Sequence, residues 1–220
     1  MKKKLCCGLL VIAICLSTRA QQKTLPIPPV YQQTPEWCWV TCGEMIFRYF
    51  GICPINPISY QCGIIALLAP QCYNSCLSCI VGAGTSQRIV NMLYQYPAVA
   101  ANNCPNGKLH VTCTDLMGQC SANDLVNNID ADMPIMAGIT PAGGGTNTQP
   151  AHVVLIVGYN ALPDGTLWLI VNDPFPYAAF NMQDPYTYYQ GQMLQQGQFA
   201  IRYSAFSTMF NWSRTLVDIQ

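Results

Sequence analysis

The pattern of hydrophobic and polar positions divides the chain into two halves of different character. In the first half, residues 37–50 are apolar around almost the whole circumference of a helix, interrupted only by a narrow polar stripe of Glu44 and Arg48. A helix that is apolar nearly all round is buried at the centre of a domain. The Thr34-Pro35 pair predicts where this helix begins, because a hydroxyl N-cap is followed by proline, and Gly51 predicts where it ends.

Two more helices are predicted in the first half, over residues 59–70 and 86–96, with a cysteine-rich segment between them. The second half opens with a helix that starts after Ser121, in a sequence like a capping box, and continues through about residue 131. Short apolar segments of β type follow it, at residues 134–139, 152–159, 166–171 and 198–203. Helices that precede the strands, instead of alternating with them, predict an α+β fold.

Turn and loop residues add two expectations. Pro163-Asp164-Gly165 predicts a hairpin turn between two of the strands. Further on, tyrosines gather in a stretch rich in Pro and Gln, where we expect an aromatic loop that packs on its own domain, with a surface for a substrate or partner as the alternative. These tyrosines are Tyr177, Tyr186, Tyr188 and Tyr189.

The N-terminus has the pattern of a secretory signal peptide. Three lysines at residues 2–4 precede an apolar stretch over residues 5–16 and a small-residue end at Ala20. We therefore expect residues 1–20 to be a signal peptide and residues 21–220 to form one domain. An uncleaved membrane anchor is the alternative, but the apolar stretch is shorter than the about 20 residues that span a bilayer.

Composition excludes several classes of protein. Charged residues make up 9% and hydrophobic residues 51%, which argues against a disordered chain. Lys+Arg and Asp+Glu are equal at 10 each, so no basic excess is present to bind nucleic acid. With 2 His, the chain cannot build a multi-histidine metal centre, and we expect no cofactor.

The 13 cysteines are informative together with the signal peptide, which carries Cys6, Cys7 and Cys15. Export leads to an oxidising compartment, so most of the remaining ten should be paired in disulfides. A zinc site made of Cys72, Cys76 and Cys79 is the alternative.

Cys38 is the first candidate for chemistry, since it lies in the first turn of the predicted buried helix. The partial positive charge of a helix N-terminus favours a thiolate, which is the nucleophilic form of cysteine. Gln32 precedes it in an extended, Pro-rich lead-in, from which its amide and the Cys38 N–H could both donate to an oxyanion. The alternative is that Cys38 is one more disulfide partner.

His152 opens an apolar strand and is the better candidate for a base, whereas His110 lies in a less ordered context. Asp173 follows the next predicted strand. Because adjacent antiparallel strands bring the end of one beside the start of the other, Asp173 could orient the imidazole, and Asn172 could do so through its amide oxygen. A turn residue before Pro174 is the alternative for Asp173.

These motifs resemble those of the papain-like cysteine peptidases, above all the short secreted bacterial forms with Trp-Cys-Trp around the nucleophile, akin to the bacteriocin-processing peptidases. The resemblance rests on residues 32–39, 151–159 and 171–174 and on Tyr60-Gln61-Cys62. It implies a helical lobe, about residues 30–107, packed against an antiparallel β-rich lobe, about residues 108–220, with the active-site cleft between them. It also implies four roles: Cys38 as nucleophile, His152 as base, Asp173 as orienting residue and Gln32 as oxyanion donor.

The expected function is that of a secreted or periplasmic cysteine endopeptidase that hydrolyses protein or peptide substrates through an acyl-enzyme. No nucleic acid, no metal and, after signal cleavage, no membrane are expected as partners, and the oligomeric state is left open. Two alternatives remain: a transglutaminase-like acyltransferase with the same residues, and an inactive, disulfide-stabilised binding protein on the same scaffold.

Cysteine parity constrains this reading of the sequence. If Cys38 is the nucleophile, nine mature cysteines remain, so at least one more is free or intermolecular. Cys42, one turn along the same helix, is the candidate for a free core thiol. The remaining eight allow up to four bridges of unknown connectivity: Cys53, Cys62, Cys72, Cys76, Cys79, Cys104, Cys113 and Cys120.

Overall fold

The computed structural model describes residues 21–56, 59–103, 107–140 and 152–220. The expected signal peptide at residues 1–20 and Cys104 lie outside the described residues. The helices are α1 (Cys38–Tyr49), α2 (Tyr60–Leu68), α3 (Ser86–Ala100), α4 (Ala122–Asp130), α5 (Pro185–Tyr188) and α6 (Tyr203–Met209). The strands are β1 (Gln21–Thr24), β2 (Thr114–Met117), β3 (Ile135–Ile139), β4 (His152–Ala161), β5 (Leu167–Asn172), β6 (Gln192–Gln195), β7 (Gln198–Arg202) and β8 (Arg214–Val217).

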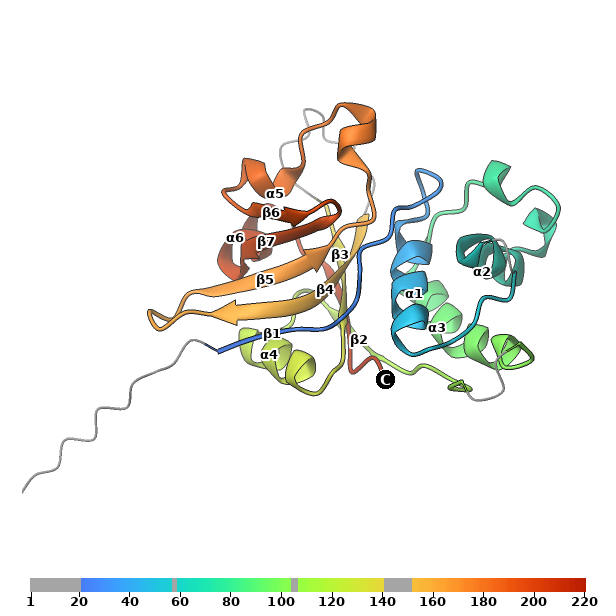
Figure 1. The fold of residues 1–220 in the computed structure, drawn as a ribbon, viewed down its shortest axis with the longest axis horizontal. Coiled ribbons are helices and arrows are strands. Elements are labelled where there is room, and N and C mark those ends of the chain that lie inside the picture. The colour runs from blue at the N-terminus through green and yellow to red at the C-terminus, as the bar shows by residue number, and fades with distance from the viewer. Residues whose placement is uncertain (1–20, 57–58, 104–106, 141–151) are drawn as a thin grey trace, which may run out of the picture.

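The strands of the described residues form one antiparallel sheet in the order β2-β8-β3-β4-β5-β7-β6, and β1 pairs with β4. Figure 1 shows α1, α2 and α3 gathered on one side of the molecule and the twisted sheet, with α4, α5 and α6, on the other. Helix α1 lies between these parts, in contact with α2, α3 and β4. The predicted α+β fold, with a helical lobe against an antiparallel β-rich lobe, is therefore confirmed.

The buried central helix is present, but its predicted start is wrong. Helix α1 begins at Cys38 and not at Pro35, with Trp37 as the N-cap residue. The preceding residues form a turn, in which Trp37 N donates to the Thr34 carbonyl. The side chain of Gln32 stabilises this turn by donating to the carbonyls of Thr34 and Pro35. As a result, the nucleophile candidate is the first residue of the helix.

The other predicted helices and strands are found with shifted ends. Ser59 and Ser121 cap α2 and α4 by accepting hydrogen bonds from Cys62 N and Asp124 N. Helix α3 continues beyond its predicted end at residue 96 and contains Pro97. Gly165 takes a positive φ of 85° in the predicted hairpin between β4 and β5. The short strands β1, β2, β6 and β8 and helices α5 and α6 are not predicted by the pattern.

Two disulfides bind the cysteine-rich segment to α2 and to itself, between Cys62 and Cys76 and between Cys72 and Cys79. These bonds take up the thiols of the alternative zinc site. Cys53 is disulfide-bonded as well. Cys113 and Cys120 were among the eight cysteines that could form bridges, and in this structure they are free thiols like Cys38 and Cys42. Cys113 precedes β2 and Cys120 follows it. Because an extended strand rises about 3.3 Å per residue, β2 keeps the two thiols apart.

No helix within the described residues is long and apolar enough to cross a membrane.

Candidate active site

The thiol of Cys38 lies where α1 meets the sheet. Cys38 is 6% exposed, while Trp37 and Trp39 on either side of it are fully buried. As the first residue of α1, Cys38 has a backbone N–H without a partner inside the helix, because the first N–H groups of a helix precede its hydrogen-bond ladder. The partial positive charge of the helix N-terminus acts on the same position and favours negative charge there.

His152 and Asp173 meet through the pairing of β4 and β5. Leu155 of β4 is paired with Asn172 of β5, so the residue that follows β5 lies beside the start of β4. The distance between His152 Nε2 and Asp173 Oδ1 is 2.7 Å. Asn172 is turned away from the imidazole, since its Nδ2 donates to the carbonyl of Ile27. Of the two orienting candidates, it is thus Asp173 that contacts His152.

The imidazole of His152 is held in its charged form by its neighbours. Its side chain is 14% exposed. Burial lowers its pKa, but the charge of Asp173, the hydrogen bond to Asp173, and the hydrogen bond and charge of Cys38 outweigh this effect and raise the pKa to about 10. The arrangement therefore favours an imidazolium at neutral pH, in contact with the Cys38 sulfur on one side and the Asp173 carboxylate on the other.

Asp173 is fully buried and accepts several hydrogen bonds that sequence analysis did not predict. Tyr177 and Tyr186 each donate a hydroxyl to Oδ2 at 3.0 Å, and Phe175 N donates to Oδ1 at 2.8 Å. Burial, and then the charge of Asp173, raise the pKa of both tyrosines well above the usual value, so they remain protonated donors. Their stretch was expected to pack on its own domain. The one sequence signal for this contact is that the tyrosines follow closely after Asp173.

Phe175 covers the contact between His152 and Asp173 from the side. Its ring meets the imidazole edge to face, with 6.3 Å between the ring centroids. The ring of Phe180 stacks on Phe175 in turn, at 5.4 Å. Aromatic cover limits the access of water to the ion pair, which strengthens the interaction between the two charges.

Gln32 is near these residues, but its amide has other partners. Its backbone N–H donates to the carbonyl of Pro174, which ties the lead-in to the residue after Asp173. Its Nε2 donates to the carbonyls of Thr34 and Pro35 at 2.9 and 2.7 Å, and its buried Oε1 has no hydrogen-bond partner among the described residues. In this structure, then, both donors of the amide are directed at the turn before Cys38.

The side chain of Gln61 on α2 fixes the backbone on both sides of Gln32. Its Oε1 accepts from Gln33 N at 2.9 Å, and its Nε2 donates to the carbonyl of Tyr31 at 3.0 Å. The same Nε2 contacts the buried carboxylate of Glu44 on α1 at 2.9 Å. The side-chain amide of Gln61 thus pairs with the backbone on both sides of Gln32 and fixes its position. The spacing of residues along the chain does not predict this role.

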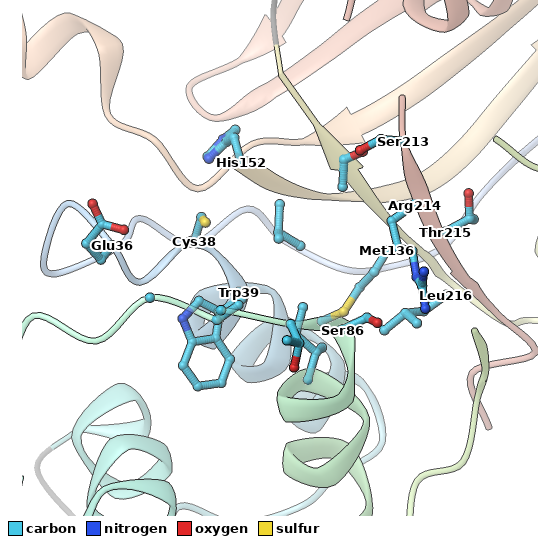
Figure 2. Close-up of a pocket in the computed structure, with 17 residues that line it drawn as sticks. Glu36, Cys38, Trp39, Ser86, Met136, His152, Ser213, Arg214, Thr215 and Leu216 are labelled. Carbon is cyan, nitrogen blue, oxygen red and sulfur yellow. The ribbon is translucent and has the colours of Figure 1, made fainter. Parts of the chain in front are cut away.

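A pocket of about 310 Å³ opens beside Cys38 and His152. Figure 2 shows Met136 and Leu216 at its far end, close to Ser86, with Cys38 on the other side. One wall is the segment of residues 82–86, and its position depends on the two tryptophans of the Trp-Cys-Trp motif. Trp37 Nε1 donates to the carbonyl of Cys79 and Trp39 Nε1 to that of Val81, both at 3.2 Å. The helix that carries the thiol therefore also positions the wall of the pocket.

The second histidine does not belong to this site. The imidazole of His110 stacks on Tyr94 at a centroid distance of 4.3 Å, and its Nδ1 lies 3.1 Å from the carbonyl of the same residue. Within the part of the chain that the structure describes, no group of three or more His, Cys, Asp or Glu side chains is arranged to hold a metal ion.

Comparison with known proteins identifies the family of this chain. Residues 24–209 match the model of the Peptidase_C39 like family. Among solved structures, the chain is similar to the proform of the Amb a 11 cysteine protease, a major ragweed pollen allergen, with a TM-score of 0.51 and 11% sequence identity. The match covers 90% of this chain and 66% of that one. No curated protein sequence matches this chain significantly. The protein therefore belongs to the Peptidase_C39 like family and has the fold of a papain-like cysteine protease.

Proposed function

We propose that this chain is a secreted or periplasmic cysteine endopeptidase with Cys38 as nucleophile, His152 as base and Asp173 as orienting residue. The observation that carries the proposal is that the imidazole of His152 contacts both the Cys38 thiol and the buried Asp173 carboxylate. Residues 1–20 would be removed as a signal peptide, which leaves a domain of residues 21–220 with lobes at about 30–107 and 108–220. Trp-Cys-Trp would place it among the short bacterial forms akin to bacteriocin-processing peptidases.

The proposed reaction has two stages. In the first, the Cys38 thiolate attacks a peptide carbonyl, and the imidazolium of His152 gives its proton to the leaving amine, so that a thioester remains on the enzyme. In the second, His152 takes a proton from water as the water attacks the thioester. This step releases the carboxylic acid and restores the Cys38 thiolate and the His152 imidazolium. Asp173 keeps the imidazole in one orientation during both proton transfers.

The oxyanion of the tetrahedral intermediate needs donors close to Cys38. The backbone N–H of Cys38, at the N-terminus of α1, is one. We assign the second to Gln32, whose amide would turn from the carbonyls of Thr34 and Pro35 towards the substrate. The backbone of Gln32 is held on both sides by Gln61, which supports this assignment because the rotation is then confined to the side chain.

The substrate would be an extended peptide lying in the cleft. The pocket beside Cys38 is lined at its far end by apolar side chains, which favours an apolar side chain of the peptide in it. The residues that form this apolar end are Ile89, Met136 and Leu216.

Competition between water and an added amine tests hydrolysis against acyl transfer. The purified protein is incubated with a fluorogenic peptide, with and without a large excess of glycine amide, and the products are separated by mass. We expect the free acid as the main product in both cases. A dominant amide product would show that the protein is an acyltransferase and not a peptidase.

Mass spectrometry of the non-reduced protein after iodoacetamide treatment tests the alternative of an inactive binding protein. We expect Cys38 to be labelled, and Cys38 in a disulfide would favour the inactive binding protein.

Replacing Gln61 by leucine is expected to lower the rate of peptide hydrolysis by up to about 100-fold, the cost of weakening one oxyanion donor. The rate at which iodoacetamide alkylates Cys38 should change less than about twofold, because alkylation forms no oxyanion and needs only the thiolate. Both rates are measured on the same preparation.

The matched control is Gln87→Leu, which removes an exposed amide that donates to Asn91 on α3, and it should alter neither rate. A parallel fall of both rates in Gln61→Leu would show that the variant disturbs the thiol itself and would contradict the assignment.

A further inference from the structure

The carboxylate of Glu36 lines the same cleft and has no role in the chemistry above. Residues 36 and 38 both line the pocket, whereas Trp37 between them is fully buried. Figure 2 shows Glu36 on one side of Cys38, and Met136 and Leu216 of the apolar end on the other. Glu36 lies against the opposite wall, since a Cβ on Gly82 would be 3.3 Å from its Oε2.

No cation of the described residues forms an ion pair with this carboxylate. The ion pairs found there join Lys23 to Asp132, Arg48 to Glu44, His152 to Asp173 and Arg214 to Asp115, so none includes Glu36. The basic group next to the wall, Arg88, donates instead to the carbonyl of Gly82 at 2.7 Å. A hydrogen bond to a carbonyl leaves the charge of Arg88 in place, but Arg88 forms no ion pair with Glu36. Among the described residues, Glu36 is therefore a carboxylate that lines the pocket beside Cys38 without a direct ion-pair partner.

The geometry of an extended peptide relates this charge to one position of the substrate. Successive side chains of an extended chain point in opposite directions and follow each other at about 3.3 Å. When one side chain enters the apolar end of the pocket, the next one turns away from it, at the level of Cys38. The residue whose carbonyl the thiol attacks is then the one that passes Glu36.

We propose that Glu36 selects a lysine or arginine as the substrate residue whose carbonyl is attacked, next to an apolar residue in the pocket. This inference rests on the proposed peptidase function and specifies its substrate as a basic peptide bond. Glu36 would act as a specificity residue, by attracting the cationic side chain across a partly exposed cleft, and it would take no part in proton transfer.

Paired probes test the proposal without depending on turnover. Two peptidyl chloromethyl ketones carry leucine followed by arginine, or leucine followed by citrulline, next to the reactive group. Citrulline has the shape of arginine without its charge. The rate constant for labelling Cys38 is expected to be about five- to twentyfold higher for arginine, as for a close, partly exposed charge pair. In Glu36→Gln this preference should disappear while the citrulline rate stays within about twofold.

The control Asp164→Asn removes one negative charge from the hairpin between β4 and β5 and should keep the preference of the wild type. A second variant, Glu36→Lys, should reverse it, so that a probe with glutamate in place of arginine reacts faster. Equal rates for arginine and citrulline in the wild type, labelling by neither, or a preference that survives in Glu36→Gln would overturn the inference. If the preference holds but neither matching fluorogenic peptide is hydrolysed, it is the peptidase function that fails.

Discussion

Replacing Cys38 by alanine is expected to lower the rate of peptide hydrolysis roughly 10⁶-fold, the loss that follows removal of the nucleophile from a catalytic group that acts as a unit. The thiol at the start of α1 is the one described cysteine that meets both the imidazole of His152 and the pocket. Initial rates with a fluorogenic peptide, together with labelling by iodoacetamide, measure the effect. The variant should fold normally, because it removes a single sulfur atom at the edge of the pocket.

Cys113→Ala is the matched control, since Cys113 is a free thiol beside β2 that does not line the pocket. It should keep full hydrolytic activity. If Cys38→Ala kept its activity and Cys113→Ala lost it, the nucleophile would have to be reassigned.

Replacing Asp173 by alanine should lower the rate of hydrolysis about 10³- to 10⁴-fold, as loss of the orienting carboxylate does in related triads. The variant would leave the imidazole of His152 and the hydroxyls of Tyr177 and Tyr186 without their buried acceptor. Removing one member of a buried ion pair costs about 3–5 kcal/mol of the free energy of unfolding. Kinetics and unfolding in urea measure the two losses.

The pH dependence of stability and activity distinguishes the effect of the Asp173 charge from the effect of its side-chain shape. The pKa of His152, about 10 in the folded protein, lies above its ordinary value of about 6.5. Its contribution to stability is therefore complete below about pH 6.5 and is lost as the pH rises through about 10. In Asp173→Asn, which keeps the shape but not the charge, this loss should begin at lower pH, and so should the fall of activity on the alkaline side.

Tyr203→Phe is the control for both measurements, because it removes a hydroxyl that donates to the carbonyl of Cys120, away from the cleft. An Asp173→Asn variant whose stability and activity followed the same pH course as the wild type would show that the carboxylate does not hold the proton on His152.

The strongest sequence patterns predicted the central parts of the fold. The nearly all-apolar α1 and the buried strands β4 and β5 are identifiable because burial on all sides leaves a continuous apolar run. The start of α1 was misplaced because Gln32 holds Thr34 and Pro35 in a turn, a contact that local propensity does not include. Strand β6 is exposed at every position, and it is a strand only because β7 pairs with it.

The candidate site divides in the same way. The proximity of His152 and Asp173 was predictable, because it follows from the pairing of two consecutive antiparallel strands. The hydroxyls of Tyr177 and Tyr186 and the amide of Gln61 were not, since their contacts depend on how loops and α2 pack against the cleft. The catalytic roles assigned to Cys38, His152, Asp173 and Gln32 remain predictions.

The wall of the pocket and the proposed nucleophile, Cys38, need opposite oxidation states of sulfur. The carbonyls that accept the indole N–H groups of Trp37 and Trp39 belong to Cys79 and Val81, at the end of the segment closed by the disulfides Cys62–Cys76 and Cys72–Cys79. Cys38, by contrast, must be a thiol to act as the proposed nucleophile. A strong reductant keeps Cys38 reduced but also cuts the bonds that hold the wall, and a strong oxidant preserves the wall but consumes the nucleophile. The activity of this protein should therefore be greatest in a window of intermediate redox potential, bounded by loss of substrate affinity on the reducing side and loss of the thiol on the oxidising side.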